Sequence, residues 1–200
     1  MFITFEGGEG TGKTTLIQNV AAILRKKHQV VTSREPGGSM IAEAIRDIIL
    51  NPKYKGVTPY TEALLLAAAR AQHLDEVIIP ALHDKKIVLC DRYIDSSLAY
   101  QAYARKLGYK FVLSINHYAT LNMPDLTFYI DLDPVVGISR IANREKYDRL
   151  DQETFDFHTK VREGYLEIAN MYSSRIVVID GNQTIEEITN QIVKKIEEKL

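Results

Sequence analysis

The chain has 200 residues, enough for one hydrophobic core but few for two domains, and its 46% apolar and 26% charged residues exclude the disordered and fibrous classes. The formal net charge of −1 provides no overall basic field, so nucleic acid is not expected as a partner. No apolar run is long enough to span a membrane, and the first residues do not resemble a signal peptide. We therefore expect a single cytoplasmic domain over residues 1–200, with no membrane partner.

Five short apolar runs predict the strands of one sheet. They cover residues 2–5, 30–32, 87–90, 126–132 and 176–179. Each run is mainly apolar and continuous rather than alternating, which is typical of strands that are covered on both faces. Longer segments with helical periodicity separate the runs, so the sequence predicts an α/β fold of three layers, with helices flanking a central five-stranded parallel sheet. Ligands of such sheets collect at the carboxyl ends of the strands, where we therefore look for a site.

A glycine-rich loop follows the first strand and matches G-x-x-x-x-G-K-[ST] in full. Its residues are Gly7, Gly8, Glu9, Gly10, Thr11, Gly12, Lys13 and Thr14. Glycines allow backbone N–H groups to turn toward phosphate oxygens, and the helix predicted to begin near Lys13 adds its positive dipole end. Lys13 can reach the β- and γ-phosphates, and the Thr14 hydroxyl can bind Mg²⁺. The motif predicts a nucleoside triphosphate site, which kinases, GTPases and motor ATPases share.

An acid at the end of a strand is the second expected part of such a site. Asp91 directly follows the run 87–90, so it is predicted to lie at the carboxyl edge of the sheet, near the bound Mg²⁺.

Arginines recur where a second phosphate would lie. The set comprises Arg34, Arg46, Arg70, Arg92, Arg140, Arg144 and Arg149. Guanidinium groups bind phosphate bidentately and stay charged, and a protein that brings two anionic nucleotides together has to neutralise their repulsion. Any one of these arginines can be a surface charge alone, but the whole set favours a second phosphate site.

Two further features favour recognition of a small molecule. Arg70 interrupts an apolar helical run and needs a polar partner, which is either a ligand or a buried carboxylate. Ser97, Tyr100 and Gln101 would share one face of a helix and offer hydroxyl, phenol and amide groups to a base and a sugar. An ordinary polar surface would explain the second feature equally well.

Taken in order, these motifs resemble the thymidylate kinase family. The resemblance spans nearly the whole chain and rests on the glycine-rich loop with its acidic Glu9 and on residues 34–38, 91–93, 97–101, 124–127 and 148–153. It implies a P-loop kinase fold with a short lid at about 137–150. It also implies transfer of a phosphoryl group from ATP, with Mg²⁺, to dTMP to give dTDP, and a homodimer that forms through helices facing away from the site.

The resemblance also implies roles for individual residues in the acceptor site. The acceptor phosphate would be held by Arg92 and Arg46, the thymine by Arg70, Ser97 and Gln101, and the sugar by Tyr100 and Glu9, with Glu35 and Pro36 also in the substrate site. Tyr100 would disfavour a ribose 2′-hydroxyl. Many members place a phenylalanine against the thymine where this chain has Leu66, so a stacking contact would be lost here.

Catalysis in this family depends on an arginine in either the loop or the lid. The loop here has none, while the lid contains Arg140, Arg144 and Arg149, as in the bacterial variant. Arg144 is the expected partner of the transferring phosphoryl group. Arg149, Lys13, Arg92 and Glu9 are further candidates for catalysis, and Arg140 would help to bind ATP.

Three alternatives remain at this point. Another kinase of the same fold could act on a different nucleoside monophosphate or on a deoxynucleoside. A GTP-driven switch would carry Asp-x-x-Gly after a strand and Asn-Lys-x-Asp for guanine, and neither occurs. A scaffold that binds nucleotides without catalysis would not need Lys13, Thr14, Asp91 and the arginines together.

Overall fold

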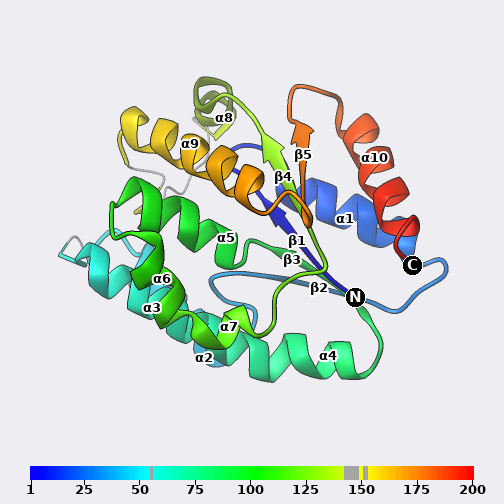
Figure 1. The fold of residues 1–200 in the computed structure, drawn as a ribbon, viewed down its shortest axis with the longest axis horizontal. Helices are drawn as coiled ribbons and strands as arrows, with labels where there is room; N and C mark the ends of the chain where they lie inside the picture. Colours follow the sequence, from blue (N-terminus) through cyan, green and yellow to red (C-terminus); the bar gives the residue numbers. More distant parts are fainter. Residues whose placement is uncertain (55, 142–148, 151–152) are drawn as a thin grey trace.

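The structure is a computed structural model that describes residues 1–54, 56–141, 149–150 and 153–200. In these residues, five parallel strands form one sheet in the order β2-β3-β1-β4-β5 (Figure 1). The strands are β1 (Phe2–Glu6), β2 (Val30–Arg34), β3 (Ile87–Asp91), β4 (Leu126–Asp131) and β5 (Ile176–Asp180). The five predicted strands and the parallel sheet are therefore confirmed, with ends that differ by one or two residues.

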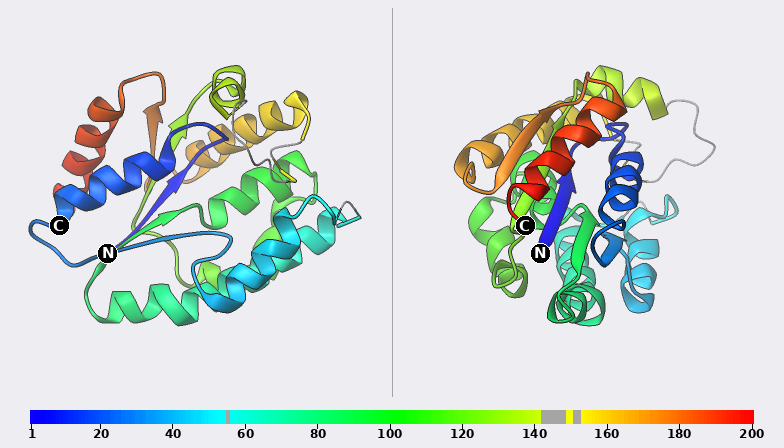
Figure 2. Two further views of the ribbon diagram at one scale, coloured as in Figure 1. Left: turned by 180° about the vertical axis from the view of Figure 1, so that it is seen from behind. Right: turned by 90° about the vertical axis from the view of Figure 1, so that its right-hand side faces the viewer.

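Helices cover both faces of the sheet, as a three-layer α/β fold requires (Figure 2). Apart from two π-helical segments, η1 (Leu74–Ile78) and η2 (Leu98–Ala104), the helices of the described residues are α1 (Lys13–Leu24), α2 (Met40–Leu50), α3 (Pro59–His73), α4 (Ile79–His83), α5 (Ile94–Ser97), α6 (Tyr109–Ile115), α7 (His117–Thr120), α8 (Pro134–Ile141), α9 (Phe155–Met171) and α10 (Ile185–Glu197). Among the described residues, no helix has the length and apolar character needed to cross a membrane.

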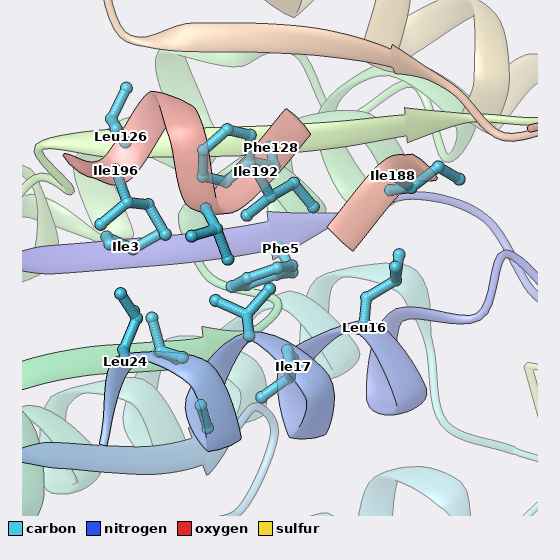
Figure 3. Close-up of a cluster of buried hydrophobic side chains, with 14 of the residues drawn as sticks. Ile3, Phe5, Leu16, Ile17, Leu24, Leu126, Phe128, Ile188, Ile192 and Ile196 are labelled. Carbon is cyan, nitrogen blue, oxygen red and sulfur yellow. The ribbon is translucent and has the colours of Figure 1, made fainter. Parts of the chain in front are cut away.

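The main hydrophobic core lies between the sheet and helices α1 and α10 (Figure 3). Alternate residues of β1 divide between the two faces, so Ile3 and Phe5 enter this core while Phe2 packs with residues of η1 and β3 on the other side. The second face is covered by α9 and η2, which form a separate buried cluster with Tyr129 of β4. Burial on both faces explains why these strands are mainly apolar and do not alternate with polar residues.

The prediction that each strand is buried on both faces is confirmed for β1, β3 and β4. It is wrong for the two outer strands, β2 and β5. The third and fifth residues of β2 and of β5 are exposed, and Val178 keeps 49% of its surface accessible. The cause is position, because β2 and β5 lie at the edges of the sheet and each pairs with one strand alone.

The helix that carries the predicted base-reading face differs from the expectation. It begins as α5 and continues as the π-helix η2, in which the Arg105 N–H donates to the Tyr100 carbonyl oxygen at 2.9 Å. Gly164 of α9 packs closely against this segment, since a Cβ there would lie 2.9 Å from the Cβ of Tyr103. The wide turn therefore lies directly against α9, and π-helical turns are often found at functional sites.

The strand register brings the polar ends of three strands together. Asp91 pairs with Phe5 of β1 and with Arg34 of β2, and Glu6 ends β1 one residue later. The predicted site therefore lies at the carboxyl edge of the sheet, between the start of α1 and the helices that follow β2 and β3.

Candidate active site

A cavity of about 320 Å³ opens at this edge of the sheet. It brings together most of the site residues predicted from the sequence, namely Glu9, Gly10, Thr11, Gly12, Lys13, Thr14, Glu35, Pro36, Arg46, Leu66, Arg70, Asp91, Arg92, Ser97, Tyr100 and Gln101. The glycine-rich loop lines the cavity together with residues of α3, α5 and η2. One continuous space thus joins a phosphate-binding loop to a set of hydrogen-bonding side chains.

The glycine-rich loop has the backbone shape that its sequence predicts. Gly10 and Gly12 have φ angles of 69° and 84°, in the left-handed region that favours glycine. A Cβ on Gly10 would lie only 2.0 Å from the carbonyl oxygen of Gly137, so the loop also packs directly on the backbone of α8. Helix α1 begins at Lys13, as predicted, and its N-terminus points into the loop.

Lys13 is buried and bonds to the loop itself. Its ammonium donates to the carbonyl oxygens of Gly7 and Gly8 at 3.1 and 2.9 Å, and to the hydroxyl of Thr11 at 3.2 Å. Burial, together with the nearby positive charge of Arg92, lowers the pKa of Lys13. The cation therefore lies among neutral oxygens, which bind it more weakly than phosphate oxygens would.

The two predicted Mg²⁺ ligands lie side by side. The Thr14 hydroxyl donates to Oδ2 of Asp91 at 3.2 Å, and both residues line the cavity next to Lys13. One hydroxyl and one carboxylate suit Mg²⁺, which takes few protein ligands and completes its shell with water and nucleotide phosphates. The residues present therefore fit this ion.

Arg92 joins the loop to the rest of the cavity. Its backbone has φ 68°, an uncommon conformation for a residue other than glycine, and it directs the side chain across the end of β1. The guanidinium donates to Oε1 of Glu9 at 2.6 Å and to the Gly7 carbonyl oxygen at 3.0 Å, and it lies 5.1 Å from the ring centre of Tyr100. Burial alone would raise the pKa of Glu9, but the charges of Arg92 and Lys13 outweigh it and lower the pKa, so Glu9 stays ionised.

Glu6 is linked to Arg92 through Ser96 and Tyr165, and the sequence analysis did not predict this role. Its buried carboxylate accepts hydrogen bonds from the Tyr93 N–H at 2.7 Å, from Ser96 Oγ at 2.6 Å and from the Tyr165 hydroxyl at 2.8 Å. Ser96 and Tyr165 in turn accept from Arg92. Burial, and then the negative charge of Asp95, raise the pKa of Glu6 to about 7. An acid that ends an apolar strand directly before the loop was the available signal.

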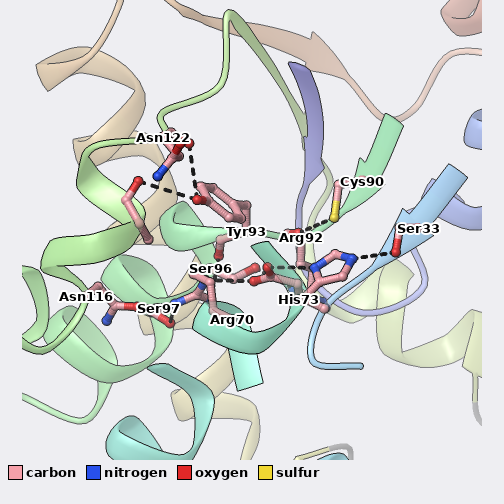
Figure 4. A network of polar contacts seen from close by, with 12 residues as sticks. Ser33, Arg70, His73, Cys90, Arg92, Tyr93, Ser96, Ser97, Asn116 and Asn122 are labelled. Atoms are coloured by element: carbon pink, nitrogen blue, oxygen red, sulfur yellow. Dashed lines mark hydrogen bonds and ion pairs between the residues drawn. The ribbon is translucent and has the colours of Figure 1, made fainter. Parts of the chain in front are cut away.

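Arg70 has a buried carboxylate partner and also lines the cavity, so both partners considered for it are compatible with the structure. Its guanidinium donates to the carboxylate of Glu35 at 2.7 Å, to Ser97 Oγ at 3.0 Å, to Asn116 Oδ1 and to the Tyr93 carbonyl oxygen at 3.0 Å (Figure 4). The buried carboxylate alternative is thus present. Arg70 also lines the cavity, and these four bonds leave one of its five N–H hydrogens for another acceptor.

Gln101 has one end of its amide fixed and the other unpaired. Its Nε2 donates to Oε1 of Glu62 at 2.8 Å, while its Oε1 is buried without a partner among the described residues. Because Gln101 lines the cavity, this unpaired acceptor is a candidate contact for a bound molecule. The contacts of Glu62 and Asn116 could not be found from the sequence, since both depend on how distant helices pack.

The predicted lid arginines are placed differently from one another. Arg140, near the end of α8, donates to the Gly10 carbonyl oxygen at 3.3 Å and so lies at the phosphate loop. Arg149 does not line the cavity, because its guanidinium bonds to Glu62 and to the Ile49 carbonyl oxygen. Among the described candidates, the geometry favours a catalytic role for Arg149 least. Arg144 lies outside the described residues.

The family model for thymidylate kinase matches residues 5–192 of this chain. The chain belongs to the thymidylate kinase family. Family membership confirms the resemblance read from the motifs and makes the protein an enzyme, a kinase, rather than a GTP-driven switch or a scaffold.

Individual members of the thymidylate kinase family match over the full chain. The thymidylate kinase of Acholeplasma laidlawii is 60% identical over 203 residues and is covered completely, as is this chain. That of Bacillus thuringiensis strain Al Hakam is 50% identical over 204 residues, which cover 100% of this chain and 98% of the relative. The crystal structure of the Ehrlichia chaffeensis thymidylate kinase superposes with a TM-score of 0.81 at 33% identity and covers 98% of each chain.

The raised pKa of Glu6 predicts that stability depends on pH. The folded state holds the Glu6 proton more tightly than the unfolded state, so this contribution to stability is present at low pH and is lost as the pH rises through about 7. In Glu6→Gln, which cannot titrate, the unfolding free energy should vary less between about pH 5 and 8, by an amount on the order of a few kcal/mol. Urea unfolding at a series of pH values measures this difference. Exposed Glu186→Gln is the control and should retain the wild-type profile; an unchanged profile in Glu6→Gln would contradict the prediction.

Proposed function

We propose that this kinase transfers the γ-phosphoryl group of ATP to dTMP, giving dTDP and ADP, in the synthesis of dTTP in the cytoplasm. The observation that carries the proposal is one cavity that is lined both by the phosphate loop and by Arg70 and Gln101. A coupled assay for ADP with dTMP, dUMP, UMP, CMP, AMP and thymidine tests it. Turnover that is highest with any acceptor other than dTMP would refute it.

The base end of the cavity matches the edge of thymine. The Oε1 of Gln101 requires a donor, and the remaining N–H of Arg70 requires an acceptor. Thymine offers an N3–H donor next to the O4 acceptor, so it can satisfy both groups at once. Ser97 holds Arg70 in place, and Leu66 contributes an apolar surface that would cover the ring.

The acceptor phosphate would lie against Arg92, with Arg46 as a second guanidinium. Arg46 donates to the Pro36 carbonyl oxygen at 2.6 Å and lines the same cavity as Arg92. The Tyr100 hydroxyl donates to Glu9 at 3.1 Å, so these two side chains form one polar edge between base and phosphate, where the deoxyribose would lie. A ribose 2′-hydroxyl would be disfavoured at Tyr100.

Catalysis would consist of positioning and charge stabilisation. The phosphate oxygen of the acceptor is already anionic, so its attack on the γ-phosphoryl group needs no strong general base. Lys13 and Arg92 would stabilise the charge that develops between the two nucleotides. Mg²⁺, held by Thr14 and Asp91, would neutralise charge on the β- and γ-phosphates. We assign Arg144 to the transferring group and Arg140 to ATP, and we retain Arg149 as an alternative to Arg144.

We also propose that the enzyme is a homodimer that pairs through the outer faces of α2 and α3. Large apolar side chains are exposed there, and they are Met40, Ile41, Ile48, Tyr60 and Leu64. An apolar surface of this kind is typical of a contact between identical subunits.

Light scattering should give twice the mass of one chain, and Leu64→Asp should halve it. A wild-type protein that remains monomeric at micromolar concentration would disprove the dimer.

Replacing Arg92 separates phosphoryl transfer from ATP binding. Arg92→Ala should reduce kcat by at least about 10³-fold, because it removes a guanidinium from the charge that develops in the transition state. The affinity for ATP should change little, as measured by calorimetry, because the phosphate loop keeps its own contacts. Arg25→Ala, beyond the C-terminus of α1, is the control. Near-normal turnover by Arg92→Ala would refute its assignment.

Position 66 is predicted to limit the affinity for the acceptor. Leu66→Phe should lower the Kd for dTMP by about tenfold, because stacking of an aromatic ring on a base is worth roughly 1–3 kcal/mol. Isothermal titration with dTMP measures the change. Leu166→Phe, on the exposed face of α9, should leave the Kd unchanged. Equal affinities of wild type and Leu66→Phe would show that Leu66 does not cover the base.

A further inference from the structure

Glu62 is a buried acid that the reaction does not use directly. It lies in the first turn of α3 with only 1% of its surface exposed. Its Oε1 accepts from Nε2 of Gln101 at 2.8 Å, and its Oε2 accepts from Arg105 at 3.3 Å and from Arg149. One carboxylate therefore joins α3, the π-helix η2 and the end of the expected lid.

We infer that Glu62 is a positioning residue that sets which base the enzyme accepts, because it binds the Nε2 end of the Gln101 amide and leaves Oε1 as an unpartnered acceptor. This inference rests on the proposed function, in which Gln101 contacts the base of the acceptor nucleotide. No part of it requires Glu62 to touch the substrate.

The chemistry of a carboxylate explains why the orientation is fixed. A primary amide can rotate by half a turn and exchange its donor and acceptor, and nothing in its shape prevents this. An ionised carboxylate accepts hydrogen bonds only, so it selects the orientation that presents Nε2. Burial alone would raise the pKa of Glu62, but the charge of Arg105 and the hydrogen bond from Arg149 outweigh it and lower the pKa. Glu62 therefore stays ionised and keeps the amide in one orientation.

A fixed acceptor in the cavity discriminates among pyrimidines. Thymine and uracil carry a hydrogen on N3 and can donate to Oε1 of Gln101. Cytosine has a lone pair on N3, so two acceptors would face each other, and a buried acceptor left unpaired weakens binding strongly. The arrangement favours dTMP and dUMP over dCMP, and the adjacent N–H of Arg70 favours the same keto pyrimidines.

Glu62→Gln tests this inference. A glutamine can donate as well as accept, so Gln101 would become free to present either end of its amide to the base. We expect the ratio of kcat/KM for dTMP to that for dCMP to fall by about tenfold or more. The loss should be mainly in KM for dTMP, since Lys13 and Arg92 are held by the loop, Glu9, Ser96 and Tyr165 and not by Glu62. Thermal unfolding shows whether the variant is folded.

Two matched variants distinguish orientation of the amide from a general structural role. Glu153→Gln removes the other carboxylate that pairs with Arg105, at 2.5 Å, without touching Gln101, and it should keep the wild-type ratio. The exchanged pair Glu62→Gln with Gln101→Glu places two acceptor oxygens at position 101, so an acceptor faces the cavity in either orientation. This double variant should recover the preference for dTMP.

The outcomes separate this inference from the proposed function. No turnover of dTMP by the wild type would refute the proposed function itself. An active wild type with an unchanged ratio in folded Glu62→Gln, or with no recovery in the folded exchanged pair, would overturn the role of Glu62 alone. If neither variant folds, a crystal structure of the wild type with dTMP decides. Gln101 Oε1 within hydrogen-bond distance of the base N3 supports the inference, and any other contact of Oε1 overturns it.

Discussion

Buried guanidinium groups require acceptors on every side, and meeting this requirement shapes the cavity from one end to the other. Arg70 is held by Glu35, Ser97 and Asn116, and Arg92 is held by Glu9 and the loop. Each pairing fixes two elements relative to each other, because losing one partner would leave a charge buried alone. The positions of α3, η2 and the phosphate loop around the cavity follow from these pairs.

The two ends of the cavity are nevertheless prepared for different tasks. Four of the N–H hydrogens of Arg70 are committed to protein acceptors, so this end is rigid and suits selection of a base by shape and polarity. At the other end, Lys13 bonds to neutral carbonyl oxygens of the loop, which phosphate oxygens can replace with a gain in hydrogen-bond strength. Arg92 is held as firmly as Arg70, by Glu9, the Gly7 carbonyl oxygen, Ser96 and Tyr165, so the exchange of partners concerns Lys13. A rigid, hydrogen-bonded set of side chains around Arg70 is thus combined with a loop whose lysine can change partners.

Much of this arrangement can be predicted from the sequence, because it depends on local order. The loop follows a strand and opens a helix, and parallel strands bring Asp91 to the same edge, so the triphosphate half needs only chain order and spacing. The contacts that complete the other half join residues far apart in the chain, such as Arg70 with Asn116 and Arg149 with Glu62. The sequence pattern does not indicate such contacts. Arg149 was therefore expected at the phosphate, and no role was expected for Glu62. The π-helical turn of η2 also depends on packing against Gly164, which belongs to a later helix.

The backbone contact between Gly10 and α8 has a consequence for how the kinase could be altered. A Cβ on Gly137 would lie 2.3 Å from the Glu9 carbonyl oxygen, so neither glycine has room for even a methyl group. A larger residue at one of these positions cannot be compensated by a change at the other, because both clashes are with main-chain atoms. An engineer who replaces the expected lid with that of another kinase must therefore join the two sequences after Gly137 and keep this backbone contact. Among natural relatives, Gly10 and Gly137 are expected to stay unchanged while the residues after Gly137 vary.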